Sequence, residues 1–184
     1  GKHVKTAVFE ATRGCNPRCD FCVVPFAWGR KPYQKPVAEV IDEIRSTGAK
    51  RAIFIDLNLI ADRAYAAELF TALIPLQIQW GGLATSLLAR DEELLDLCAR
   101  SGCMALLVGF ESISPAALKD VSKSFNSPEL YAEWIRRVHD HGIALNGTFV
   151  FGLDSDTTDV FEETAQFVID NRIDLPRFAI LTPF

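Results

Sequence analysis

Residues 6–22, TAVFEATRGCNPRCDFC, place a short apolar run directly before three closely spaced cysteines. The run is rich in residues that favour strands and predicts a strand over 6–11. Gly14 and Pro17 then favour a loop. Three thiolates spaced C-x3-C-x2-C in one loop can close around a compact metal centre. We therefore expect the first strand of the fold to carry a metal-binding loop at its carboxyl end.

The rest of the chain alternates between β-rich runs and amphipathic helical patterns. Strict alternation of this kind predicts a parallel sheet with helices packed on it. We expect strands at 6–11, 51–57, 78–83, 104–110, 143–151 and 178–181. The helices are expected at 37–47, around 69–73, between Asp91 and Gly102, between Ser127 and Gly142, and at 158–169.

The number of strand–helix units indicates an incomplete barrel. A closed eight-fold barrel typically needs about 250 residues, and this chain has 184. The prediction is an α/β fold, a parallel (β/α)6 partial TIM barrel whose last helix is missing. Apolar residues occupy both faces of the strands, which predicts burial of both faces. The helix at 158–169 is expected to bury Phe161, Ala165 and Val168.

Composition and charge narrow the class of protein. Apolar residues make up 49% and charged residues 23% of the chain, which is typical of a globular domain. No apolar run reaches the 18 or so residues of a membrane span, and no signal peptide is recognisable. A cytoplasmic location is therefore expected. The net charge of −5 makes nucleic acid an unlikely partner. We expect residues 1–184 to form one domain of a longer protein.

The cysteine spacing alone leaves the kind of metal centre open. Structural zinc sites usually take four ligands, often as two C-x2-C pairs, and no second pair follows Cys19 and Cys22. Iron–sulfur cubanes also usually take four cysteines. A cubane on three cysteines leaves one iron open for a substrate or cofactor. Cys98 and Cys103 are read as small buried apolar residues.

The loop resembles the motif of the radical S-adenosylmethionine (radical SAM) enzymes, C-x3-C-x-aromatic-C, with Phe21 at the aromatic position. The order of strand, cysteine loop and partial barrel is also similar. The segments 11–15 (ATRGC), 109–112 (GFES), 149–154 (FVFGLD) and 180–183 (ILTP) resemble the branch in which a cobalamin-binding domain precedes the radical SAM domain.

This resemblance implies a mechanism and a set of cofactors. Cys15, Cys19 and Cys22 would hold a 4Fe–4S cluster, and S-adenosylmethionine (SAM) would bind the open iron. Reductive cleavage of SAM would give a 5′-deoxyadenosyl radical for hydrogen abstraction, coupled in some members to cobalamin-dependent methylation or rearrangement. The implied partners are a small-molecule substrate and an electron donor such as flavodoxin or ferredoxin.

The resemblance also implies cofactor contacts by position. Asp56 and Asn58 follow the second strand, where the family usually has a G-G-E-like segment that this chain lacks. Asp56 is therefore either a SAM contact or a cap of the next helix, and a plain loop role is open for Asn58. Glu111 ends the fourth strand and is expected to contact SAM rather than form a structural ion pair. Leu181 is expected to frame the adenine.

Two other functions remain open at this stage. One is a non-catalytic iron–sulfur or zinc-binding domain that keeps the scaffold. The other is a methylthiotransferase-like radical SAM enzyme, whose cysteine loop is similar. The substrate is not specified by the sequence.

Overall fold

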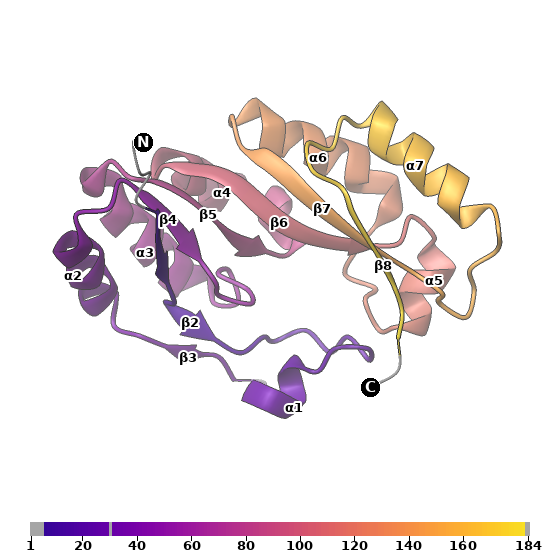
Figure 1. The fold of residues 1–184 in the computed structure, drawn as a ribbon, viewed down its shortest axis with the longest axis horizontal. Helices are drawn as coiled ribbons and strands as arrows, with labels where there is room; N and C mark the ends of the chain where they lie inside the picture. The colour runs from indigo at the N-terminus through magenta and orange to yellow at the C-terminus, as the bar shows by residue number, and fades with distance from the viewer. Residues whose placement is uncertain (1–5, 30, 183–184) are drawn as a thin grey trace, which may run out of the picture.

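A computed structural model describes residues 6–29 and 31–182 of the chain. Its main sheet has six strands in the order β1-β4-β5-β6-β7-β8, and every neighbouring pair is parallel. This confirms the predicted α/β partial barrel (Figure 1). The strands are β1 (Thr6–Phe9), β4 (Arg51–Phe54), β5 (Gln79–Ala84), β6 (Cys103–Glu111), β7 (Ala144–Phe151) and β8 (Arg177–Ile180).

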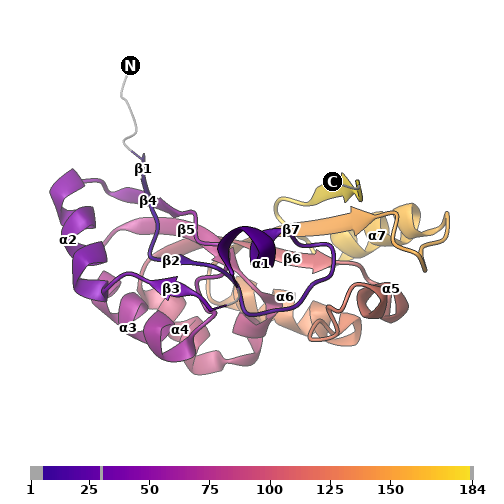
Figure 2. The same cartoon turned by 90° about the horizontal axis from the view of Figure 1, so that it is seen from below.

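The longer helices lie together on one side of this sheet (Figure 2). They are α2 (Val37–Thr47), α3 (Arg63–Leu73), α4 (Glu92–Arg100), α6 (Tyr131–Asp140) and α7 (Val160–Asp170). Three short turns of 3-10 helix, η1 (Ile74–Leu76), η2 (Ser86–Arg90) and η3 (Pro128–Leu130), lead into or out of them. No helix in the described ranges is both long enough and apolar enough to cross a bilayer.

All five expected helices are present, and the start and stop signals explain several of their ends. The Asp91 side chain accepts a hydrogen bond from the Leu94 N–H, which caps α4. Gly48 adopts a left-handed conformation just after α2. Two short helices were not predicted, α1 (Val24–Trp28) and α5 (Pro115–Asp120), because neither is long enough to show a helical period.

The predicted inner face of α7 is wrong in two of its three positions. Phe161 is 54% exposed and Ala165 is also exposed, whereas Val160, Thr164 and Val168 are buried. The helix begins at Val160, and the ring of Phe161 instead packs at 4.8 Å from that of Phe151 on the neighbouring strand. The buried stripe is consequently shifted by about one residue from the apolar pattern.

The expectation that both faces of the strands are buried is also wrong. Side chains alternate along each central strand, and one set packs against the helices while the other faces the inside of the half barrel. Val8 and Ile53 on this inner face remain 58% and 46% exposed. An incomplete barrel has no opposite strands to cover its inner side chains, which leaves an open inner face.

Candidate metal centre

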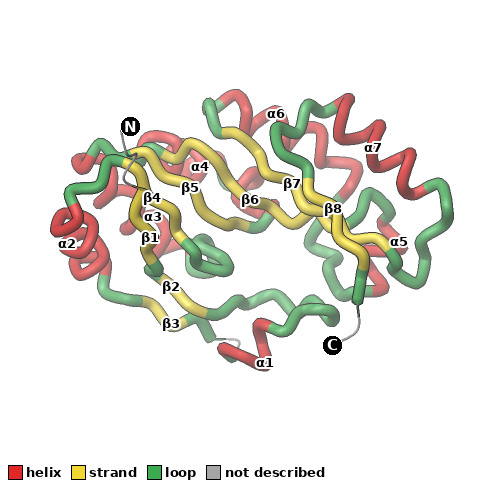
Figure 3. The backbone as a smooth tube through the Cα atoms, in the orientation of Figure 1, coloured by secondary structure: helices red, strands yellow, loops and turns green. Residues whose placement is uncertain are grey.

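The cysteine loop leaves the barrel after β1 and returns to it before α2. Two short strands join the ends of this loop: β2 (Thr12–Arg13) pairs with β3 (Tyr33–Gln34) in antiparallel fashion. Gly14 has a φ of +107°, and a side chain there would lie 3.3 Å from the Pro32 Cα. Glycine therefore lets the two limbs of the loop approach each other. Figure 3 shows this long irregular segment between β2 and α1.

The three cysteines of this loop line one cavity of about 180 Å³ at the carboxyl ends of the strands. Leu83 of β5 and Gly109 of β6 form part of its wall. We call it the cluster cavity. The Cys22 N–H donates to the Cys19 carbonyl at 3.1 Å, which turns the chain tightly between these two residues. The loop thus directs all three thiols to the end of the barrel at which such folds have their active sites.

The thiols influence one another and are influenced by a nearby lysine. Burial raises the pKa of Cys19 to about 11, against the lowering effect of Lys123. Burial likewise raises the pKa of Cys15, while a hydrogen bond from the Asn58 side chain and the charge of Lys123 oppose this rise. Lys123 is therefore the cation that favours thiolates in this cavity. Lys123 is not among the site residues predicted from the sequence.

Lys123 forms a buried ion pair with Glu111. The expectation that Glu111 would not form a structural ion pair is therefore wrong. The Nζ and Oε1 atoms lie 2.5 Å apart, and the two side chains are only 9% and 11% exposed. A Cβ on residue 109 would collide with this ion pair, so the pair requires glycine at this position. Glu111 itself has a φ of +62°, at an irregularity in the pairing of β6 with β7. Both charged groups line the cluster cavity.

Asp56 lies behind the loop rather than in the cavity lining. Its carboxylate accepts hydrogen bonds from the Ala11 N–H, at 3.1 Å to each oxygen, and from the Thr12 N–H. The residue is 1% exposed, and burial raises its pKa above the usual range although these hydrogen bonds oppose the rise. The carboxylate thus fixes the point at which the chain enters the cysteine loop. Because it is buried and outside the cavity lining, the carboxylate does not face a ligand in the cluster cavity.

Asn58 is buried near Asp56, behind the cysteine loop. It is 3% exposed, and its Oδ1 accepts from the Ile60 N–H at 3.3 Å. Its side chain also lowers the pKa of Cys15, which opposes the effect of burial on that thiol. Asn58 therefore belongs to the buried surroundings of the loop.

The two apolar candidates lie in different surroundings. Phe21 lines the cluster cavity and packs against the small group formed by Ala117, Val121 and Leu153. Leu181 lies beyond β8, donates its N–H to the Phe151 carbonyl at 2.8 Å, and is 39% exposed. Leu181 is not among the residues that line the cavity.

The donor set fits an iron–sulfur cluster. Three thiols reach one cavity from a single loop, and each thiolate of a cubane bonds its own iron. Within residues 6–29 and 31–182, no three His, Cys, Asp or Glu side chains converge on a point as ligands of one ion would. Thiolates on separate irons do not need that convergence.

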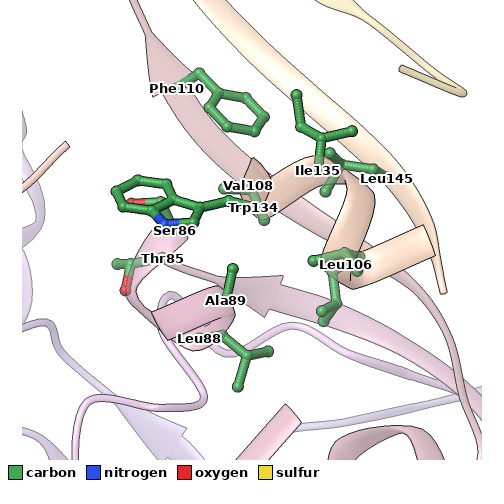
Figure 4. A pocket seen from close by; sticks show the side chains of 11 residues that line it. Thr85, Ser86, Leu88, Ala89, Leu106, Val108, Phe110, Trp134, Ile135 and Leu145 are labelled. Carbon is green, nitrogen blue, oxygen red and sulfur yellow. The ribbon is translucent and has the colours of Figure 1, made fainter. Parts of the chain in front are cut away.

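A further void lies behind the sheet, between η2, β6 and α6 (Figure 4). Its volume is about 20 Å³, and its lining is almost wholly apolar, with Trp134, Ile135 and Leu145 among its walls. A void of this size holds at most one water molecule. It is a packing defect of the core and not a ligand site.

Comparison with known proteins agrees with this geometry. The sequence profile of the Radical SAM superfamily matches residues 9–168. The chain belongs to the radical SAM superfamily. The predicted membership of this superfamily and the predicted enzyme class are thereby confirmed.

The relatives include methyltransferases. Bacteriochlorophyllide d C-12(1)-methyltransferase of Chlorobaculum tepidum is 34% identical over 180 residues, which cover 95% of this chain and 40% of that protein. Hopanoid C-2 methylase of Rhodopseudomonas palustris is 30% identical over 176 residues, covering 90% and 33%. This radical SAM chain therefore spans about two fifths or less of these two relatives.

Among solved structures, the radical SAM methyltransferase TsrM of Kitasatospora setae, with cobalamin and a [4Fe-4S] cluster bound, matches with a TM-score of 0.86 at 20% identity. The match covers 95% of this chain and 36% of TsrM. At this identity the likeness concerns the fold, and it is the fold predicted for the radical SAM core.

Proposed function

We propose that this chain is the catalytic core, residues 1–184, of a radical SAM methyltransferase. Cys15, Cys19 and Cys22 would hold a 4Fe–4S cluster and leave one iron open for SAM. The observation that carries the proposal is that these three thiols line one cavity at the carboxyl ends of the strands. When bound and reduced, the cluster supplies the electron that cleaves SAM to a 5′-deoxyadenosyl radical.

The residues around the cavity have distinct proposed roles. Phe21 and Glu111 would contact SAM, and Lys123 would face its carboxylate as a positive charge. Asp56 and Asn58 would position the loop, Asp56 through the backbone at Ala11 and Thr12. Leu181 would reach the adenine only if the segment after β8 closes over the cavity.

The remaining partners follow from the relatives and from redox chemistry. Both relatives described above are named as methylating enzymes of a bacteriochlorophyllide or a hopanoid, so we propose a bulky, largely apolar small molecule as substrate. Cobalamin would be held by a part of the protein outside this chain. A flavodoxin or ferredoxin would donate the electron, and a cytoplasmic location suits thiols that must stay reduced.

Anaerobic reconstitution with iron and sulfide tests the proposal. We expect about four irons per chain, a brown chromophore, and 5′-deoxyadenosine from SAM after reduction with dithionite. Cys98→Ala is the matched control, because Cys98 is buried beside Cys103, outside the cluster cavity. A colourless protein that binds one zinc, or a brown protein that never cleaves SAM, would contradict the proposal.

A further inference from the structure

The inner face of the half barrel has a second hollow, toward the amino ends of the strands. Its volume is about 330 Å³, and its floor includes Ile53, Gly81, Met104 and Ala105. Ile53 and Met104 are 46% and 48% exposed, so their apolar surface faces the open side of the barrel. We call it the lower hollow. Burying such surface against an apolar ligand is favourable.

The lower hollow and the cluster cavity lie on the same face of the sheet. Gly81 lines the lower hollow and Leu83 the cluster cavity, on the same strand and facing the same side. Ala105 and Leu107 stand in the same relation on β6. Two residues of a strand span roughly 6–7 Å. The two hollows are thus neighbours along the same strands, and we call them together the trough, which leads away from the cysteines.

Small residues keep the floor of this trough low. Gly81 and Ala105 are paired in register, and a Cβ on Gly81 would lie 3.2 Å from the Ala105 carbonyl oxygen. Ala105 is in turn paired with Ala144 on its other side. The neighbours of residue 105 on both adjacent strands are small, so a larger side chain at this position can be accommodated beside them. It would extend into the trough.

The far end of the trough carries a positive charge. Arg51 lines the lower hollow, is exposed, and is paired in register with Thr6 and Gln79. The ion pairs within the described part of the chain do not include Arg51. A guanidinium group binds a carboxylate through two parallel hydrogen bonds. The lower hollow thus combines an apolar floor with a cation at its end.

We propose that the trough is the substrate site of the methyltransferase, that it takes one bulky and largely apolar molecule, and that Arg51 binds a carboxylate of that molecule. The reacting part of the substrate then lies in the cluster cavity, and the carboxylate lies at the amino ends of β1, β4 and β5. This inference rests on the proposed function. It adds a specificity-determining residue remote from the cysteines.

Binding of a carboxylated tetrapyrrole tests the inference without turnover. Chlorin e6, which carries three carboxylates, and its trimethyl ester are titrated into the full-length gene product and followed by chlorin absorbance. Arg51→Gln should weaken binding of the acid about tenfold, since a charge-assisted pair is lost, and leave binding of the ester unchanged. Arg45→Gln is the matched control, because Arg45 lies exposed on α2 in a pair with Asp42.

A second variant tests the trough itself. Ala105→Leu should weaken binding of both chlorins at least tenfold, because the added atoms occupy the floor. Equal losses in Arg51→Gln and Arg45→Gln, tight binding by Ala105→Leu, or no binding by the wild-type protein would each overturn the inference. SAM cleavage by the wild-type protein is measured separately. If cleavage fails while chlorin binding depends on Arg51, the proposed function is wrong and the trough stands.

Discussion

Removal of the Asp56 carboxylate should weaken the whole fold as well as the cysteine loop. In Asp56→Ala, the N–H groups of Ala11 and Thr12 lose their acceptor in a site that is 1% exposed at Asp56. Each buried donor left without a partner costs about 1–3 kcal/mol. Part of this is offset, because burial raises the pKa of Asp56 and the ionised carboxylate is itself costly to bury. The expected net loss is about 2–4 kcal/mol.

Thermal unfolding and hydrogen exchange of the metal-free protein measure this loss. For a domain of this size, about 3 kcal/mol lowers the Tm by roughly 6–12 °C. The amides of Ala11 and Thr12 should exchange faster in Asp56→Ala than in the wild-type protein. Asp154→Ala is the control, because Asp154 is an exposed acid on the loop after β7. If Asp56→Ala and Asp154→Ala unfold within 2 °C of each other, roughly the scatter expected for surface substitutions, the anchoring role of Asp56 is refuted.

Three further outcomes are expected. The pKa of Asp56 is raised in the folded state, so above about pH 4 the native protein keeps a proton that the unfolded chain has lost. The free energy of unfolding therefore falls as pH rises through the folded pKa. A series of Tm measurements should show this fall in the wild-type protein and not in Asp56→Asn. Lys123→Met should raise the pKa of Cys19 further and slow its alkylation by iodoacetamide at pH 8 about threefold or more, as followed by mass spectrometry. An unchanged rate, or an equal slowing in the exposed-site control Lys119→Met, would contradict the role of Lys123. Cys22→Ala should reduce bound iron well below about four per chain while Cys98→Ala keeps it, and equal iron contents would exclude Cys22 as a ligand.

The order and direction of the strands could be predicted from the sequence because each strand carries its own apolar pattern and each helix its own end signals. Asp91 and Gly48 mark helix ends by local chemistry alone. The exposure of the inner face could not be predicted in this way. Val8 and Ile53 have the same apolar character as buried residues, and only the missing strands of the barrel leave them uncovered.

Some residues of the site could be predicted from a local motif, whereas others are brought together only by the tertiary fold. The three cysteines and Phe21 occupy consecutive positions of one motif, so their spacing was sufficient to group them. Lys123 meets Glu111 only because the chain after α5 folds back over the end of β6, and one sequence gives no signal for that contact. The hydrogen bonds of Asp56 to residues 44 and 45 positions earlier likewise leave no trace in local sequence patterns.

The pairing of β2 with β3 closes the base of the cysteine segment. Its two ends are held together at Arg13 and Tyr33, and Gly14 lies next to Gly29 and Pro32. The stretch around α1 has no buried side chain, so changes there transmit little to the barrel beneath. Evolution can therefore lengthen or redecorate the stretch around α1 to suit a new electron donor or companion domain while the sulfur atoms and the sheet keep their mutual alignment.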